Sequence, residues 1–356
     1  LHDQETAASG AEAEARNARN KAREAEENAR KEADARKRAD READAAWANQ
    51  YVAHINRIEA DWEIANVGRI RDTLDIYRKR PAGRGRQRLT LAELADRYVL
   101  YQHAVQDPEG DVVRVRRMYE RLYGRTPRTL REDFCGTAAF AAAWVKAHRE
   151  NRAIGGDLDR DPLDRGRRHN LGKLRPEQAR RISLLQEDVR SARTPKVDVL
   201  VAFNFSFFLF KQRAALLDYF RHCYAHVKND GIFVIDAYGG PESMEKRRER
   251  RRVGNFTYIW DQHSYDPITH DASCHIHFEF RDGSKIERAW TYHWRLWTIA
   301  ELRELLIEAG FASATVYWEG TEAATNEPNG IFRPRKRAEG DPAWVAYLVA
   351  AKTDPR

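Results

Sequence analysis

The stretch LREDFCGTAAFAAAW (Leu130–Trp144) decides the fold, together with AIGGDLD (Ala153–Asp159), which follows it. Each contains the apolar residues of a short strand, and an alanine-rich helical segment lies between them. A loop that binds a nucleotide needs small residues where its backbone approaches the ligand. Gly136 is the one glycine of the first stretch, and it lies between the strand and the helix. The pair therefore predicts a strand, a loop, a helix and a second strand, with the loop as a candidate cofactor site.

The same alternation of strand and helix continues along the chain. Five apolar runs lie at 130–135, 153–158, 182–188, 197–203 and 229–238. Helical segments separate them, except that a loop follows the third run. Because parallel strands need crossover helices, the alternation predicts a parallel sheet with helices on both faces. A helix capped by Thr298 and Glu301 follows, and two final strands are expected at 313–320 and 343–352. We therefore expect an α/β fold with a doubly wound, seven-stranded, mostly parallel sheet over residues 128–352.

The residues before this region have a different composition. Residues 1–50 are rich in alanine and in charged side chains, and alanines recur at a heptad-like spacing, at positions 11, 15, 18, 22, 25 and 29. This pattern predicts a helical arm that either pairs with a partner, for example as a coiled coil, or stays a lone solvated helix. Residues 51–127 are expected to be helical around a basic linker at 78–88. In that region Thr90 opens a helix with a capping box, and another helix ends at Gly124.

The formal charge of +7 is not spread evenly over the 356 residues. The first fifty residues hold 12 acidic and 10 basic side chains, so the positive excess lies in the rest of the chain. It is concentrated in the linker 78–88 and in KRRERRR (Lys246–Arg252). Such clusters can bind phosphate groups, but a solvated charged surface is the more common cause, and we favour it.

Composition also bears on the compartment. No apolar run is long enough to cross a bilayer, so we expect no membrane insertion. The three cysteines lack the spacing of a disulfide framework or a zinc cluster. We expect a reducing compartment, the cytoplasm by default. An organelle matrix stays open, because the chain begins at Leu1 rather than Met and could be a processed form.

The order of elements from the first strand onward resembles that of the class I S-adenosylmethionine (SAM)-dependent methyltransferases. In that family the first strand ends in an acid, a spacer and Gly-x-Gly-x-Gly, and EDFCGTA aligns with this motif. Glu132 takes the acid position with Asp133 beside it, while Phe134 and Ala138 replace the outer glycines. The resemblance implies that backbone amides of the loop face the amino-acid part of the cofactor, at Cys135, Gly136 and Thr137.

The resemblance also implies cofactor contacts at the next strand ends: Asp157, Asp159, Asp188, Val189, Asn204 and Phe205. Asp157 would accept hydrogen bonds from both ribose hydroxyls, with Asp159 as a backup or a helix cap. Asp188 would accept from the adenine amino group, and the Val189 amide would face the ring. Asn204 and Phe205, with Ser206, would surround the reactive methyl group. The alternative cofactor, NAD, calls for G-x-G-x-x-G, whereas FCGTAAF has a single glycine, so we expect SAM.

An insertion at about 239–297 is expected to cover the acceptor pocket, as additions at this point commonly do in the resembling fold. Its alternating pattern, with RDGS at 281–284 as a turn, predicts an antiparallel hairpin that acts as a lid. One strand face should carry His275, His277 and Glu279. It could ligate a metal, but a polar wall is favoured and no metal is predicted. Another face should carry Trp290, Tyr292 and Trp294. It is either an aromatic wall for a flat or cationic acceptor or packing of the lid on the sheet.

Methyl transfer from a sulfonium needs in-line alignment more than covalent help. A base is useful when the acceptor is protonated, and the lid offers His263, Tyr265 and His293. The expected function is SAM-dependent methyl transfer to a nitrogen or oxygen of a small molecule. One alternative is an RNA or protein methyltransferase that uses the basic segments, although a nucleic-acid partner is not favoured. The other is a catalytically silent subunit of the same fold, which acts in assembly through its N-terminal helix and binds a protein partner through residues 1–77.

Overall fold

The computed structural model describes residues 90–322 and 328–354. These residues belong to one of the two units into which the chain divides, Val67–Arg356. The predicted helical or coiled-coil arm at 1–50, the helical segment 51–77 and the basic linker 78–88 lie outside the described residues.

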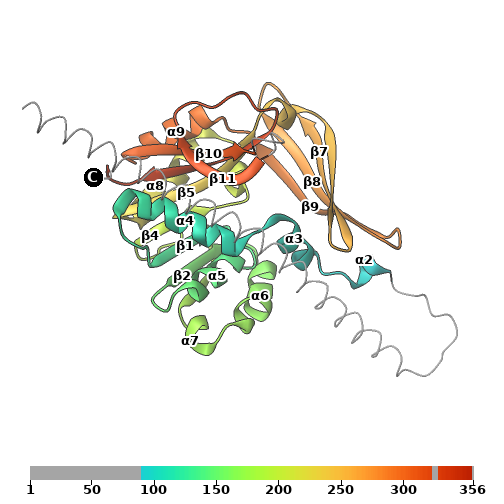
Figure 1. Ribbon diagram of the computed structural model, residues 1–356, viewed down its shortest axis with the longest axis horizontal. Helices are drawn as coiled ribbons and strands as arrows, with labels where there is room; N and C mark the ends of the chain where they lie inside the picture. Colours follow the sequence, from blue (N-terminus) through green and yellow to red (C-terminus); the bar gives the residue numbers. More distant parts are fainter. Residues whose placement is uncertain (1–89, 323–327, 355–356) are drawn as a thin grey trace, which may run out of the picture. The chain divides into compact units, whose positions relative to one another are not determined.

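A mixed sheet of eight strands forms the centre of the described unit, in the order β11-β10-β12-β5-β4-β1-β2-β3 (Figure 1). The strands are β1 (Thr129–Asp133), β2 (Arg152–Asp157), β3 (Ile182–Gln186), β4 (Val197–Ala202), β5 (Val227–Gly239), β10 (Ser313–Thr321), β11 (Pro328–Arg335) and β12 (Trp344–Ala351). The first five pair in parallel, and β12, β10 and β11 are antiparallel to their neighbours. The expected doubly wound α/β sheet is therefore present.

The sheet has one strand more than the seven expected, because β11 pairs with β10 at the edge. Its sequence, PNGIFRPR, has two prolines and a glycine and no regular alternation, so it does not read as a strand. Proline lacks the N–H that a central strand must donate, but an edge strand tolerates that loss.

Helices precede and connect the strands, and all but the short helix Pro176–Ala179 lie in segments that the sequence predicts to be helical. They are α2 (Leu91–Leu94), α3 (Arg97–Val105), α4 (Pro108–Tyr123), α5 (Ala139–Ala147), α6 (Arg160–His169), α7 (Pro176–Ala179), α8 (Arg213–His226) and α9 (Ile299–Glu308). The capping boxes at Thr90 and Thr298 and the left-handed stop at Gly124 are all present. Alternate residues of β4 and β5 enter two separate hydrophobic clusters, one shared with α8 and α9 and the other with α4 and α5. The sheet is thus buried on both faces, as a parallel sheet requires.

The lid is a separate four-stranded antiparallel sheet in the order β6-β7-β8-β9. Its strands are β6 (Arg247–Val253), β7 (Phe256–Tyr265), β8 (Asp271–Phe280) and β9 (Lys285–Arg295). The predicted hairpin is β8–β9, joined at the RDGS turn, and two further strands precede it. In the arginine-rich β6, Arg248 pairs with Asp261 and Arg250 with Glu279. No helix in the described part of the chain is long and apolar enough to span a membrane.

Candidate functional site

The loop after β1 keeps the backbone shape of a glycine-rich loop although two of its glycines are replaced. Phe134, Gly136 and Ala138 have φ angles of 58°, 52° and 54°. A left-handed conformation costs a non-glycine residue about 1–2 kcal/mol, so the surrounding structure must hold these residues in place. The three left-handed positions alternate, at the sites where the aligned motif has its glycines.

Two carboxylates hold this loop. Glu132, at the end of β1, is buried and accepts a hydrogen bond from the Ala141 amide at 3.0 Å, in the first turn of α5. Asp157 ends β2, and its Oδ2 accepts from the Gly136 amide at 2.8 Å. Its Oδ1 accepts from the Asp159 amide at 2.9 Å. Burial raises the pKa of Asp157. Asp157 therefore contacts the middle of the loop, whereas Glu132 links the end of β1 to the first turn of α5.

The other predicted cofactor residues of this edge have partners of their own. Asp159 accepts from the Asp161 amide and caps α6, which was the alternative role for this residue. Asp133 points into the core, where it pairs with Arg131 at 2.7 Å. Val189 is buried, and its carbonyl accepts from Arg131. Both oxygens of Asp188 accept from the Arg190 guanidinium, whose Nε lies 3.0 Å from Oδ1 and whose Nη2 lies 2.6 Å from Oδ2. The structure brings Asp157 to the loop and turns the Asp133 side chain away from it.

The loop residues Cys135 and Thr137 join the neighbouring elements. The Cys135 amide donates to the Gly156 carbonyl at 3.0 Å, and its side chain is buried. The Thr137 carbonyl accepts from the Asn170 side chain at 2.8 Å. A Cβ on Gly166 would stand 2.4 Å from that same carbonyl, so helix α6 lies against the loop with no room for a side chain. Both ends of the loop are therefore fixed.

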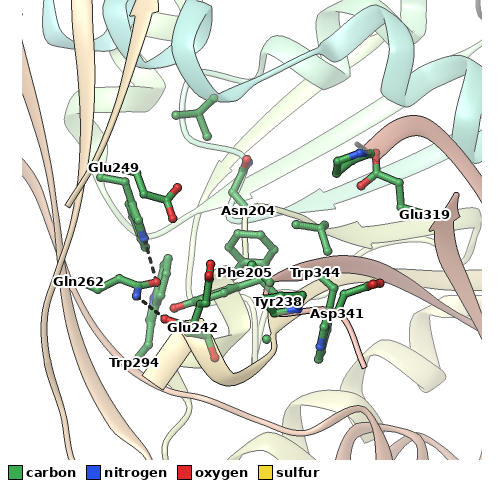
Figure 2. Close-up of a pocket in the computed structure, with 18 of the residues that line it drawn as sticks. Asn204, Phe205, Tyr238, Glu242, Glu249, Gln262, Trp294, Glu319, Asp341 and Trp344 are labelled. Atoms are coloured by element: carbon green, nitrogen blue, oxygen red, sulfur yellow. Dashed lines mark hydrogen bonds between the residues drawn. The ribbon is translucent and has the colours of Figure 1, made fainter. Parts of the chain in front are cut away.

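A cavity of about 660 Å³ lies beside the carboxyl ends of β4 and β5, between the central sheet and the lid (Figure 2). The lid contributes the aromatic side chains of Tyr258, Trp260, Tyr292 and Trp294. The main sheet and the loop after β4 contribute Phe205, Tyr238, Trp318 and Trp344, and α3 contributes Tyr101. The predicted aromatic face of β9 therefore forms a cavity wall with Tyr292 and Trp294, while Trp290 packs on Tyr98 and Tyr101 instead.

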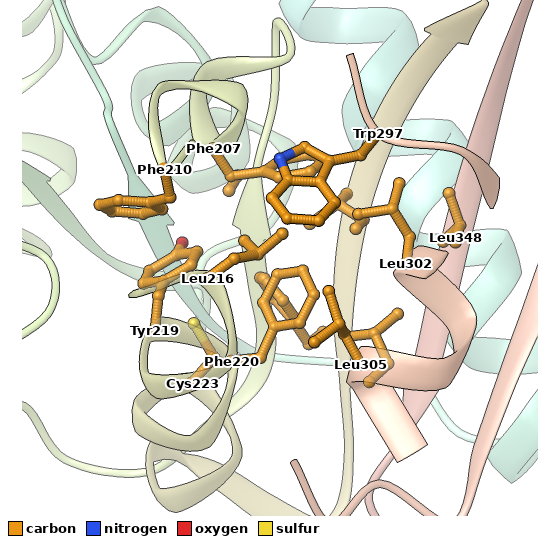
Figure 3. Packing of buried hydrophobic residues seen from close by; sticks show 14 of the residues in the cluster. Phe207, Phe210, Leu216, Tyr219, Phe220, Cys223, Trp297, Leu302, Leu305 and Leu348 are labelled. Carbon is orange, nitrogen blue, oxygen red and sulfur yellow. The ribbon is translucent and has the colours of Figure 1, made fainter. Parts of the chain in front are cut away.

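The segment after β4 links this cavity to the core. Asn204 and Phe205 line the cavity, and both are left-handed, with φ angles of 58° and 57°. The Asp236 carboxylate accepts from both backbone amides, at 2.9 and 3.0 Å. Phe207, in the short helix that follows, and Phe210 are buried in the cluster shown in Figure 3. Asp236 and this aromatic anchor therefore fix Asn204 and Phe205 at the edge of the cavity.

The three candidate bases do not line the cavity. Trp260, Gln262, Tyr292 and Trp294 face it, and successive side chains of a strand point to opposite faces. His263 and His293 are accordingly exposed on the other face of the lid, where His293 contacts the Ser273 hydroxyl. Tyr265 packs against the hydrophobic cluster and His270. The sequence placed these residues in the lid, but their strand parity turns the two histidines away from a bound acceptor.

On the face of β8 that carries His275 and His277, each polar side chain contacts a partner of its own. His277 Nε2 lies 3.3 Å from Asp261 Oδ2, and His275 Nδ1 lies 2.9 Å from the Thr291 hydroxyl. Glu279 pairs with Arg250 and Lys285. Among the residues that the structure describes, no group of three or more His, Cys, Asp or Glu is arranged to hold a metal ion.

Several cavity residues could not be found from a motif. Tyr101 precedes the predicted domain, and Glu319 and Asp341 lie near its end. Asp236, which holds two of the cavity residues, could have been predicted from the sequence. It is a carboxylate near the end of a parallel strand, as Asp157 is. The criterion that singled out Asp157 would have singled out Asp236 as well.

Replacing Glu132 by glutamine is expected to stabilise the protein more at pH 8 than at pH 5. Burial raises the pKa of Glu132 to about 8, whereas a glutamate in an unfolded chain titrates near about 4.3. Between these values the folded state holds a proton that the unfolded state has lost. The contribution of Glu132 to stability therefore falls as the pH rises through this window. Glutamine keeps an oxygen for the Ala141 amide and does not titrate.

Urea unfolding at pH 5 and pH 8 measures this effect. We expect the gain from Glu132→Gln to be about 1–3 kcal/mol larger at pH 8. Glu304→Gln, an exposed carboxylate on α9, is the matched control and should show no such difference. An equal effect of Glu132→Gln at both pH values would contradict the raised pKa.

Comparison with known proteins supports the fold. No protein-family model matches the chain, and no curated protein matches it by sequence. The chain is similar in structure to DesVI of Streptomyces venezuelae, with a TM-score of 0.53 at 17% identity, over 72% of this chain and 96% of that one. It is also similar to SAM-bound CalS10, an amino pentose methyltransferase from Micromonospora echinaspora, with a TM-score of 0.52 at 14% identity, over 76% and 100% of the two chains.

A third similar structure is the sugar N-methyltransferase KedS8 of Streptoalloteichus sp., with a TM-score of 0.51 at 15% identity, over 77% of this chain and 98% of that one. These matches span nearly the whole of the solved structures and leave part of this chain outside. The chain therefore has the fold of the class I SAM-dependent methyltransferases.

Proposed function

We propose that this protein transfers a methyl group from SAM to a nitrogen or oxygen of a small molecule that binds in the cavity beneath the lid. The observation that supports this most is the loop Phe134–Ala138, which is left-handed at the three glycine positions of the family motif. Its middle amide contacts Asp157, the carboxylate expected to bind ribose.

The residues of the loop suit SAM in space and in hydrogen-bonding groups. Among the described residues, apart from Gly136 and its two chain neighbours, no heavy atom lies within 4 Å of the point where a Cβ on Gly136 would stand, so the backbone there has room for a ligand. The Phe134 ring packs against Phe210 and Tyr219, with centroid distances of 6.0 and 5.8 Å, and so turns toward the core. Each Asp157 oxygen accepts one backbone N–H and keeps a lone pair for a ribose hydroxyl. When bound there, SAM would supply an activated methyl group.

The chain's own residues would then position the acceptor. Asn204 and Phe205 are fixed by Asp236 at the point where the resemblance expects the reacting groups. Aromatic side chains from the lid and the sheet line the cavity and would exclude water from the acceptor. Alignment of this kind accounts for much of the catalysis that methyl transfer needs.

A small molecule is favoured over a nucleic acid as the acceptor. Two arginines of the basic segment Lys246–Arg252 are engaged by carboxylates of the lid itself, Arg248 by Asp261 and Arg250 by Glu279. The other basic segment, 78–88, lies outside the described residues. Two of the similar structures are described as methyltransferases of an amino pentose and of a sugar nitrogen.

Incubation with methyl-labelled SAM and a panel of small amines and phenols tests this proposal. We expect mass spectrometry to detect a methylated product together with S-adenosylhomocysteine, and we expect the Asp157→Asn variant to form much less of both at micromolar SAM. Methylation of RNA or protein in place of every small acceptor would contradict the assignment of acceptor class. A folded protein that methylates none of these would contradict the enzymatic role.

A further inference from the structure

The lid cavity lacks positive charge in a chain that is rich in it. Lys and Arg make up 62 of the 356 residues. None of the described residues that line the cavity is Lys, Arg or His, and four of them are carboxylates. A phosphorylated or carboxylate ligand would meet repulsion there, whereas a cation would be attracted.

Two of the four carboxylates already have a cation. Arg247 contacts Glu242, and its Nε lies 3.2 Å from Oε1 of Glu249. The negative charge of Glu242 and Glu249 is therefore partly neutralised by Arg247, so these two carboxylates do not indicate a charged ligand.

The other two carboxylates, Glu319 on β10 and Asp341 before β12, are different. Across residues 90–322 and 328–354, neither has an ion-pair partner. Glu319 Oε1 accepts from the Gly330 amide at 2.8 Å, and Asp341 Oδ2 accepts from the Trp318 indole N–H at 3.3 Å. Within the same described residues, the second oxygen of each side chain accepts no hydrogen bond. Burial raises the pKa of Glu319, and the charge of Arg114 partly offsets that rise. A bound cation would favour the ionised form further.

Aromatic rings line the same cavity. Trp318 and Trp344 pack with ring centroids 5.1 Å apart, and the Trp318 indole donates to Asp341. An indole face attracts an ammonium group. On the lid side, Tyr292 and Trp294 stack with centroids 4.3 Å apart and planes 25° from parallel. These rings offer a flat apolar surface on which a planar skeleton can lie.

We infer that the acceptor carries a protonated amine on a flat, apolar skeleton, and that the ammonium group is recognised by the aromatic rings of this cavity together with two of its carboxylates, Glu319 and Asp341. This inference rests on the proposed function, which makes the cavity the acceptor site. It assigns a class of substrate, an alkylamine that carries an aromatic or other flat apolar group.

Three probes of one shape and different charge test the inference: 3-phenylpropylamine, 3-phenylpropanol and 3-phenylpropanoate. In calorimetric titrations at pH 7, we expect the amine to bind about tenfold more tightly than the alcohol and the carboxylate to bind most weakly. In Glu319→Gln/Asp341→Asn, the amine should fall to the affinity of the alcohol, while the alcohol is unaffected. The control Glu304→Gln should behave as the wild type.

Equal affinities for the three probes, a preference for the carboxylate, or no binding of any probe would overturn the inference. The ranking in the wild type is sufficient for this, even if the double variant does not fold. S-adenosylhomocysteine titrated into the same samples reports separately on the proposed function. An amine preference without cofactor binding would contradict the methyltransferase proposal alone, and cofactor binding without an amine preference would contradict the substrate class alone.

Discussion

Replacing Arg131 by methionine is expected to lower the free energy of unfolding by about 3–5 kcal/mol, because it leaves a buried carboxylate without its cation. Arg131 lies in β1 and is 1% exposed. Its Nε is 2.7 Å from Asp133 Oδ1, and its guanidinium also donates to the carbonyls of Val189 and Ala192. The side chain thus joins β1 to the segment after β3, which contains Asp188 and Val189. Urea unfolding at neutral pH measures the loss.

The double variant Arg131→Met/Asp133→Asn is the matched control. It removes both charges, so it should recover a large part of the stability that the single variant loses. Asparagine still offers an oxygen to the Tyr219 hydroxyl, which donates to Asp133 at 3.0 Å. A single variant that loses less than about 1 kcal/mol, the usual range of an exposed pair, would contradict the structural role of this ion pair.

Replacing Asp236 by alanine is expected to lower the free energy of unfolding by about 2–4 kcal/mol, because two backbone donors lose their acceptor. Those donors are the amides of Asn204 and Phe205, which are also held in a left-handed conformation. Without the carboxylate, the hydrogen bonds that hold Asn204 and Phe205 in the left-handed conformation are lost. The edge of the cavity that these two residues form should therefore change its conformation. We expect turnover to fall more than tenfold while S-adenosylhomocysteine still binds, because the loop Phe134–Ala138 has its own supports.

Asp236→Asn provides the comparison for this effect. The amide oxygen can accept from one of the two donors, so its loss of stability should be smaller than that of the alanine variant. Burial raises the pKa of Asp236 to about 7, and the asparagine variant also removes this titration. Alanine and asparagine variants of equal stability would contradict the role of Asp236 as an acceptor for both amides.

Much of the fold follows from the sequence because its signals are local. Strand and helix periodicity, capping boxes at Thr90 and Thr298, and the RDGS turn each depend on residues close together in the chain. The strand β11 escaped detection because its stability comes from pairing with β10 rather than from its own composition. Phe134 replaces a glycine of the motif. In the structure its ring packs into the core and its backbone keeps the left-handed shape.

Less of the candidate site could be predicted from the sequence. Asp157 could be identified because a motif and a strand end coincide there. The cavity combines α3, the ends of β4 and β5, the lid and the residues around β10 and β12, and no spacing links them. The candidate bases His263 and His293 were chosen by residue type, whereas strand parity decides which face of the lid they occupy. Partners such as Arg190 for Asp188 depend on rotamers that a sequence does not specify.

The proposed function requires that the loop Phe134–Ala138 and Asp157 bind SAM. Calorimetric titration of S-adenosylhomocysteine into the wild type and into Asp157→Asn measures this binding. We expect micromolar binding to the wild type and affinity about tenfold to a hundredfold weaker in the variant, since hydrogen bonds to a charged group are lost. No binding to the folded wild type, or equal affinity in the two proteins, would contradict it.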